Sequence, residues 1–137
     1  MSELRPFHFA VPVNDLVKAR EFYGIFLGFE EGRSDKQWID WNFYGHQFVT
    51  HLSPKYKPEN YCNSVDEHTV PIPHFGVVLT MEDWKQLAEK LKNHHIEFIF
   101  KPYIRFKGKP GEQATMFFLD PSGNALEFKA FNNLFEK

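Results

Sequence analysis

Two short stretches decide the fold, His8-Phe9-Ala10-Val11 and its echo His74-Phe75-Gly76-Val77. Each opens a run of apolar, aromatic and β-branched residues, which is the composition of a β-strand. A motif that recurs along a chain indicates two copies of one structural unit. The sequence therefore predicts two related halves, each beginning with a strand that carries a histidine.

A helix is predicted directly after each of these strands. In the first half Asn14 or Asp15 can cap the helix, apolar residues follow at spacings of three and four, and Gly28 ends it. In the second half Thr80 begins a capping-box pattern, and the helix is expected to end near residues 93–95. Both helices are amphipathic, so each should pack one face against a sheet.

Three strand-like segments follow each helix. They span 29–33, 37–44 and 46–52 in the first half, and 97–103, 114–119 and 125–131 in the second. We therefore predict one α+β domain over residues 1–137, with two βαβββ modules at 1–52 and 73–137. The modules are expected to form a curved mixed β-sheet barrel around one cavity, with the helices outside. The proline-rich stretch 53–72 is expected either to link the modules or to fold over a site.

The composition is that of a globular protein. Of the 137 residues 42% are hydrophobic, and sixteen are Phe, which supports a packed core. A net charge of −2 provides no basic face of the kind that nucleic acid needs, so no nucleic-acid partner is expected. No stretch has the length of a membrane span or the pattern of a signal peptide, and the single Cys62 fits a reducing compartment. These features predict a cytoplasmic protein that does not contact membranes.

Strand alternation decides which side chains share a face of a sheet. On the first strand His8 projects beside Ala10, and on its echo His74 projects beside Gly76. On the last strand Glu127 points away from the apolar residues on either side of it. The small neighbours leave room for a bound group. If the halves curl around one cavity, we expect His8, His74 and Glu127 to meet there.

Two imidazoles and one carboxylate are a donor set that holds a divalent iron, manganese or nickel ion, and zinc accepts the same donors. Each residue alone is a weak signal, because a single histidine on a strand is more often a core or surface residue. The equivalent placement of His8 and His74 in the two halves outweighs that objection. With Glu127 they predict one metal ion with open positions for a small-molecule substrate.

Further motifs join the two histidine stretches. They are AREFY at 19–23, LGF at 27–29 and the closing motif FLDPSGNALEF at 118–128. Together these residues resemble the vicinal oxygen chelate superfamily, which includes glyoxalase I, extradiol ring-cleavage dioxygenases and bleomycin-resistance proteins. The resemblance covers nearly the whole chain, and it implies that His8, His74 and Glu127 bind the metal.

A fourth position distinguishes the subfamilies. Enzymes like glyoxalase I often place a glutamate on the last strand of the first half, where the best matching residue here is His51. Extradiol dioxygenases use two histidines and one glutamate, and His51 would then be an acid or base, although a histidine can also ligate. The resemblance thus favours an iron(II)-dependent, extradiol-type dioxygenase acting on a small catechol-like or enediol substrate. Zn²⁺, Mn²⁺ and Ni²⁺ are the alternative ions.

Two other functions stay open. The first is a lyase or isomerase like glyoxalase I, in which the metal stabilises an enediolate. The second is a non-catalytic, drug-sequestering resistance protein, a class that tends to lack the full triad. Arg33 and Arg105 are candidates to bind a substrate carboxylate. A homodimer is expected as well, because a small chain rich in aromatic side chains has apolar surface left to bury.

Overall fold

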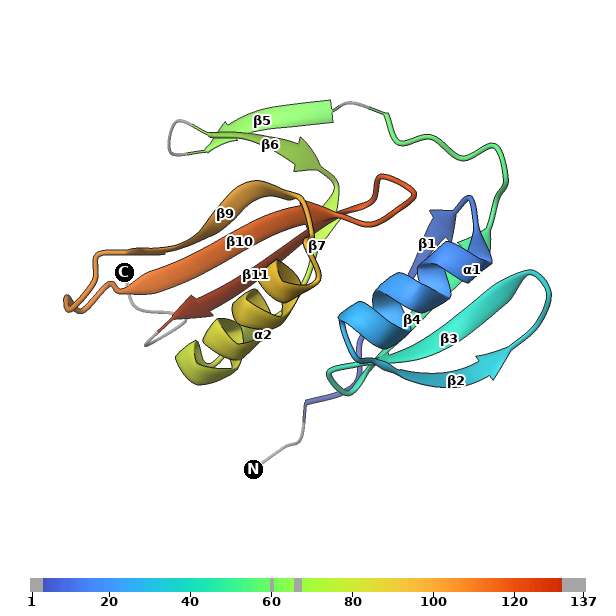
Figure 1. The fold of residues 1–137 in the computed structure, drawn as a ribbon, viewed down its shortest axis with the longest axis horizontal. Helices are drawn as coiled ribbons and strands as arrows, with labels where there is room; N and C mark the ends of the chain where they lie inside the picture. The colour runs from blue at the N-terminus through green and yellow to red at the C-terminus, as the bar shows by residue number, and fades with distance from the viewer. Residues whose placement is uncertain (1–3, 60, 66–67, 132–137) are drawn as a thin grey trace. The chain divides into compact units, whose positions relative to one another are not determined.

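The computed structural model describes residues 4–59, 61–65 and 68–131. The chain divides after residue 58 into two compact units, unit 1 (1–58) and unit 2 (59–137). Each unit has its own main sheet, of four strands in unit 1 and five in unit 2, and its own helical segment (Figure 1). The outermost parts of the two predicted modules, residues 1–3 and 132–137, lie outside the described residues.

Unit 1 is a strand, a helix and three strands. Its elements in chain order are β1 (His8–Val13), α1 (Leu16–Ala19), η1 (Arg20–Phe26), β2 (Glu30–Ser34), β3 (Trp38–Phe43) and β4 (His46–Leu52). The sheet order is β1-β4-β3-β2, in which β1 runs parallel to β4 and the other neighbours are antiparallel. This is the mixed sheet that a βαβββ module predicts.

Local sequence explains where the helix and the hairpin of unit 1 lie. Asp15 caps α1 because its Oδ1 accepts a hydrogen bond from the Lys18 backbone N–H at 3.0 Å. Gly28 ends the helical segment with a φ of +76°. Tyr44 and Gly45 both have positive φ, as the two-residue turn between β3 and β4 requires. The predicted end of the helix at Gly28 is confirmed, and the turn at residues 44–45 separates the two predicted strands 37–44 and 46–52.

The second half of the helix is wider than an α-helix. In η1 the Leu27 N–H donates to the Phe22 carbonyl, five residues back. Phe22 and Tyr23 are both buried, with ring centroids 4.9 Å apart, and Tyr23 also contacts Trp41 and Phe48 of the sheet. Regular α-helical spacing predicted an apolar face that omits Phe22 and consists of Leu16, Ala19, Tyr23, Phe26 and Leu27.

Unit 2 repeats the arrangement after an additional hairpin. Its elements are β5 (Tyr61–Val65), β6 (His68–Ile72), β7 (His74–Phe75), β8 (Val78–Leu79), α2 (Met81–Asn93), β9 (Phe98–Arg105), β10 (Gln113–Leu119) and β11 (Ala125–Phe131). The main sheet has the order β7-β11-β10-β9, with β8 also pairing β11. Both β7 and β8 run parallel to β11. Thr80 caps α2 through a 3.1 Å hydrogen bond from the Asp83 N–H, as predicted.

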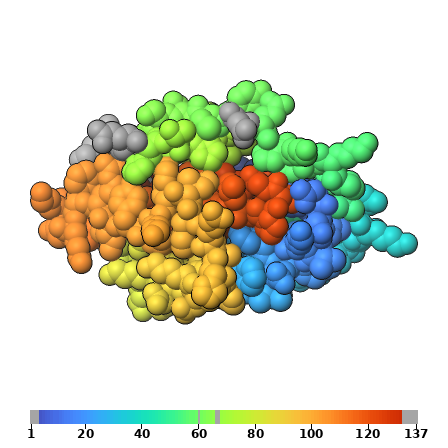
Figure 2. All heavy atoms as spheres, turned by 45° about the horizontal axis from the view of Figure 1, so that its top comes forward, coloured from blue at the N-terminus to red at the C-terminus, as the bar shows by residue number. Residues whose placement is uncertain are grey.

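Part of the predicted linker is an ordered hairpin. Strands β5 and β6 pair antiparallel with each other and lie on the face of the main sheet opposite to α2 (Figure 1). Val70 of β6 packs with Phe117, Ala125 and Phe100. The hairpin and β9 are separated in the sequence by α2 but lie side by side in space (Figure 2). The ring centroids of His68 and Phe100 are 4.5 Å apart.

The closing motif forms a tightly bonded turn between β10 and β11. The Asp120 carboxylate accepts hydrogen bonds from the backbone N–H groups of Ser122 and Asn124 and from the Asn124 side chain, at 2.8–2.9 Å. Gly123 has a φ of +93°, which favours glycine. The turn therefore fixes the start of β11, the strand that carries Glu127.

The α+β class, with mixed sheets and two helical segments, is confirmed. No closed barrel is found in the described part of the chain. A small barrel needs about eight strands, whereas the two main sheets have four and five, and each stays open. Among the described residues no helix is both long and apolar enough to cross a membrane.

Candidate functional site

The main sheet of unit 2 has one buried face and one open face. Along β11 the buried residues Leu126, Phe128 and Ala130 alternate with the partly exposed Glu127 and Lys129. The buried face packs against α2, where the Trp84 indole N–H donates to the Phe128 carbonyl at 3.0 Å. Glu127 and Lys129 are therefore held on the open face by the packing of their neighbours.

His74 and Glu127 meet on this open face. His74 Nε2 lies 3.4 Å from Glu127 Oε1. The other ring nitrogen of His74, Nδ1, lies 2.8 Å from the Pro71 carbonyl oxygen. Because a carbonyl oxygen only accepts, Nδ1 is the donor in this hydrogen bond, and Nε2 faces Glu127 Oε1. Thr115 donates to the second carboxylate oxygen, Oε2, at 2.6 Å and so orients Glu127.

This pair fits a metal ion. Two ligand atoms bound to one ion at about 2.0–2.2 Å lie roughly 2.9–3.4 Å from each other, and the observed 3.4 Å falls within that range. An ion placed between Nε2 and Oε1 could therefore be bound by both atoms. A histidine whose second ring nitrogen donates to a carbonyl is the usual form of a metal-binding histidine.

Gly76 makes the close approach between these strands feasible. A Cβ atom at Gly76 would lie 1.8 Å from the Glu127 carbonyl oxygen and 2.7 Å from its carbonyl carbon. Both contacts are with backbone atoms, which cannot swing aside as a side chain can. Glycine at this position therefore sets the separation of the β7–β8 segment from β11, and with it the separation of His74 from Glu127.

The pair opens into a cavity of about 150 Å³ within unit 2. Its lining combines aromatic, polar and charged side chains from the hairpin and from four strands of the main sheet: Val65, His68, Val70, His74, Phe100, Tyr103, Arg105, Gln113, Thr115, Glu127 and Lys129. This volume is smaller than the roughly 300–1,000 Å³ of pockets for drug-sized ligands. The cavity therefore suits a small molecule.

The sequence analysis did not predict three of the lining residues, Phe100, Tyr103 and His68. Strict alternation would place Phe100 and Tyr103 on opposite faces of β9. The structure has a register shift between them, since Phe100 pairs with Phe117 and Tyr103 with Thr115, so both line the cavity. His68 was assigned to the linker, but it lies on β6 and its ring contacts both Phe100 and Tyr103. The prolines around His68 gave no strand pattern that would have placed it there.

In unit 1, His8 has an environment similar to that of His74. It lies on β1, and its Nδ1 is 3.0 Å from the side-chain oxygen of Gln47 on β4. That contact leaves Nε2 for another partner. Gln47 and His51 are four residues apart on β4, so they project from the same face of the sheet as predicted. His51 is exposed and is paired across the sheet with Pro12 and Trp38.

The pairing registers show which residues correspond in the two units. His8 pairs with Gln47 and Ala10 with Val49, whereas His74 pairs with Ala125. Gln47 on β4 therefore corresponds to Ala125 on β11. Two residues further along each strand, Val49 of unit 1 corresponds to Glu127 of unit 2. Two residues further along, His51 matches Lys129, which pairs with Val78. The position that mirrors Glu127 is thus apolar.

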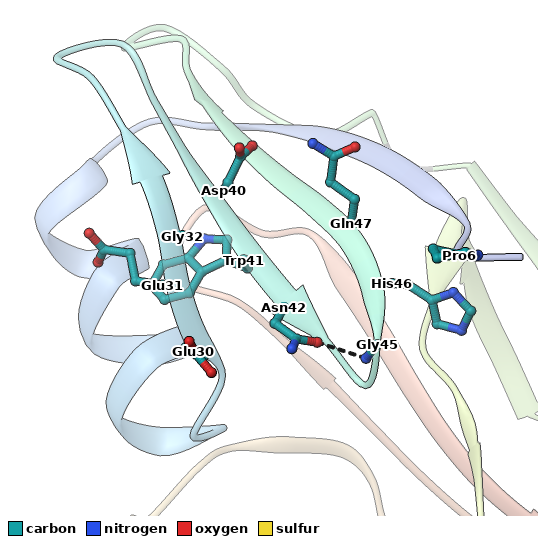
Figure 3. A pocket seen from close by; sticks show the side chains of 10 residues that line it. All are labelled: Pro6, Glu30, Glu31, Gly32, Asp40, Trp41, Asn42, Gly45, His46 and Gln47. Atoms are coloured by element: carbon teal, nitrogen blue, oxygen red, sulfur yellow. Dashed lines mark hydrogen bonds between the residues drawn. The ribbon is translucent and has the colours of Figure 1, made fainter.

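A second hollow lies in unit 1 and does not include His8 or His51. Its walls are rich in acidic and amide side chains, comprising Pro6, Glu30, Glu31, Gly32, Asp40, Trp41, Asn42, Gly45, His46 and Gln47. Figure 3 shows Asp40 and Gln47 pointing to the same side of the sheet. His46 is occupied structurally, because its Nδ1 accepts a hydrogen bond from the Phe7 N–H at 2.8 Å.

The remaining candidates fall in separate places. Arg105 lines the cavity of unit 2, whereas Arg33 of unit 1 lies over the Trp38 ring at 5.6 Å. His8 and the His74–Glu127 pair belong to different units. Within residues 4–59, 61–65 and 68–131 no group of three or more His, Cys, Asp or Glu side chains gathers in the way that a metal site would.

The sequence and the fold both match a known protein family. The family model described as the Glyoxalase/Bleomycin resistance protein/Dioxygenase superfamily matches residues 5–128. The chain belongs to this superfamily. A solved structure from Alicyclobacillus acidocaldarius, described as a glyoxalase/bleomycin resistance protein/dioxygenase, is 32% identical. That comparison covers 94% of this chain and 92% of the other, with a TM-score of 0.75. The predicted resemblance is confirmed.

More distant superfamily structures share the fold. A glyoxalase/dioxygenase from Nostoc punctiforme is 18% identical, with 97% of this chain and 99% of the other covered and a TM-score of 0.70. A genomically encoded fosfomycin resistance protein from Listeria monocytogenes is 19% identical, with 98% and 96% covered and a TM-score of 0.69. A search of curated proteins gave no match. At these identities the likeness extends to the fold alone.

Proposed function

We propose that the protein is a metal-dependent enzyme in which His8, His74 and Glu127 hold one divalent ion. The observation that carries the proposal is the His74–Glu127 pair, in which Nε2 of His74 faces Oε1 of a carboxylate that Thr115 holds through Oε2. His8 is the third ligand because it begins the matching strand of unit 1 and presents an imidazole oriented by Gln47. The ion is Fe²⁺ in this proposal, with Zn²⁺, Mn²⁺ and Ni²⁺ as alternatives.

Three protein ligands fit this chain better than four. In unit 1 the position that mirrors Glu127 holds Val49, which has no ligand atom. A site with two histidines and two carboxylates at the mirrored positions is therefore not available. Three ligands leave positions open for two adjacent substrate oxygens, which favours an extradiol-type dioxygenase over a lyase or isomerase like glyoxalase I.

The bound ion would supply Lewis acidity, which lowers the pKa of the hydroxyl groups of a catechol-like or enediol substrate. The protein side chains do the rest. Glu127 and His74 keep their orientation through Thr115 and the Pro71 carbonyl, and the β5–β6 hairpin covers one side of the cavity. His51, in this proposal, takes or returns a proton of the substrate, because an imidazole can act as a general acid or base.

The proposal requires the open faces of two sheets to contribute to one ion. A single chain can supply both faces by curling around one cavity, which is the arrangement predicted from the sequence. Two chains of a homodimer can supply them instead, one face each. Mixing a His8→Ala chain with a Glu127→Ala chain distinguishes these cases, because only sites shared between chains regain an intact set of ligands.

Reconstitution with Fe²⁺ under anaerobic conditions, followed by oxygen-uptake measurements over a panel of catechols, tests the reaction. The same preparation loaded with Zn²⁺ or Ni²⁺ is assayed in parallel for isomerisation of a glutathione hemithioacetal. Oxygen uptake that depends on iron and is lost in Glu127→Ala supports the dioxygenase. Hemithioacetal turnover without oxygen uptake would replace it with the lyase or isomerase.

A further inference from the structure

We infer that the unit 2 cavity binds an oxyanion at one end, so that the substrate is a small acid whose carboxylate lies against Arg105 and Lys129. This inference rests on the proposed metal site and specifies its substrate class. It starts from the charges of the described lining residues, which include two cations, Arg105 and Lys129, and one carboxylate, Glu127. Together these described side chains carry a net positive charge, and a divalent ion would add two further charges.

The charged residues are spread along the sheet in rows. Cross-strand pairs place Phe100, Phe117 and Glu127 in one row, then Tyr103, Thr115 and Lys129, and then Arg105 and Gln113. Neighbouring rows along a strand are roughly 7 Å apart. The cavity thus changes from aromatic, beside the metal pair, to cationic at its far end. A molecule that spans it has its chelating oxygens at the first row and its anion at the second and third.

Lys129 connects the two functions. Its Nζ lies 3.8 Å from Glu127 Oε1, the same oxygen that faces His74 Nε2. A metal ion at that oxygen takes the place of the ammonium group and repels it. Lys129 then needs a different negative partner, and the oxyanion of the substrate supplies one. Binding of the metal and binding of the acid should therefore favour each other, since such coupling is reciprocal.

Arg105 and Gln113 give the far end its hydrogen-bonding capacity. They pair across β9 and β10 and both line the cavity. The guanidinium carbon of Arg105 lies 5.0 Å from the centre of the Phe106 ring, which limits the directions that the side chain takes. A guanidinium offers paired N–H donors that match the two oxygens of a carboxylate, and an amide adds another donor.

Calorimetric titration with benzoate and with benzamide, its uncharged counterpart, tests the inference. The titrations are run on metal-free protein and on protein loaded with Zn²⁺, and phenylphosphonate separates a phosphonate preference from a carboxylate preference. The variants are Arg105→Met and Lys129→Met. The control is Arg20→Met, which removes an arginine that is paired with Glu31 and lies outside this cavity.

We expect benzoate to bind more tightly than benzamide, and either cavity variant to weaken benzoate by roughly 10-fold to 100-fold with little effect on benzamide. Arg20→Met should change neither affinity. Lys129→Met should also strengthen Zn²⁺ binding, measured by chelator competition. Equal binding of benzoate and benzamide, or unchanged benzoate affinity in both cavity variants, would overturn the inference. Charge-dependent benzoate binding in protein that takes up no metal would leave the anion site standing and reject the proposed metal site instead.

Discussion

Thr115 is the residue on which the orientation of Glu127 depends most directly. Its hydroxyl donates to Oε2 at 2.6 Å, which leaves Oε1 directed at His74. Replacing Thr115 with Val keeps the shape of the side chain but removes the donor. We predict that Thr115→Val weakens metal binding by roughly 10-fold to 100-fold, the usual effect of losing a partner that orients a ligand.

Chelator competition measures that change, and Thr115→Ser is the matched control because serine keeps the hydroxyl group. The serine variant should bind metal with close to the original affinity. Equal affinities in the valine and serine variants would show that Glu127 does not need this hydrogen bond to bind the ion.

His51 is the second residue with a role to test. It matches Lys129 in the register of the repeat, and it lies on the same sheet face as Gln47. If it transfers a proton, His51→Ala should keep the metal and lose roughly 10²–10⁴-fold in turnover. If it is a ligand instead, the same change weakens metal binding.

Metal content and turnover of the His51→Ala protein separate these roles, with His94→Ala as a control for the loss of an exposed histidine. Metal and activity that both survive the change would make His51 a packing residue. That outcome would also remove the main sequence argument against glyoxalase chemistry.

At the scale of single elements, the β7–β8 segment depends on Gly76. A Cβ there would overlap the Glu127 backbone, so an alanine must push the strand away from β11. We predict that Gly76→Ala lowers the free energy of unfolding by about 1–3 kcal/mol, the range for overpacking, and weakens metal binding as His74 moves.

Urea unfolding and chelator competition measure both effects. Gly111→Ala is the matched control in the same unit, because no atom lies within 4 Å of a Cβ at that position. It should leave stability and metal affinity nearly unchanged. A Gly76→Ala protein as stable as the control would contradict the close approach of the two strands.

The same elements show what the sequence can and cannot predict. The bounds of β4 and β11 match the predicted 46–52 and 125–131, because apolar alternation and a specific turn define both strands. The β5–β6 hairpin was not predicted as strands. Residues 61–65 are all exposed, and prolines interrupt the apolar alternation that would indicate strands. The hairpin is attached to the main sheet through Val70 and His68, whose partners are distant in the sequence.

The candidate site likewise contains residues that the sequence places correctly and residues that it does not. His74 and Glu127 could be placed on one face by alternation, and the structure brings them together. Tyr103 could not be placed there, because alternation puts it on the face opposite to Phe100. The register shift in β9 is what brings both side chains to the same face. Pro102, between them, lacks a backbone N–H and is tolerated because β9 is an edge strand.

At the scale of the whole molecule, we predict a homodimer. Large apolar side chains remain exposed in both units, among them Phe7, Val17, Ile25, Val78 and Leu119. Removing such surface from water favours association. Sedimentation velocity at micromolar concentration should give twice the mass of one chain, and a single species with the mass of one chain would contradict the prediction.

The central claim concerns one divalent ion held by His8, His74 and Glu127, and elemental analysis of the purified protein tests it most directly. We expect about one ion per chain in the wild-type protein and in His94→Ala, and loss of the ion in His8→Ala, His74→Ala and Glu127→Ala. Circular dichroism of each variant establishes that it is folded. Stoichiometric metal in both His74→Ala and Glu127→Ala would contradict the account, because the ion would then have other ligands.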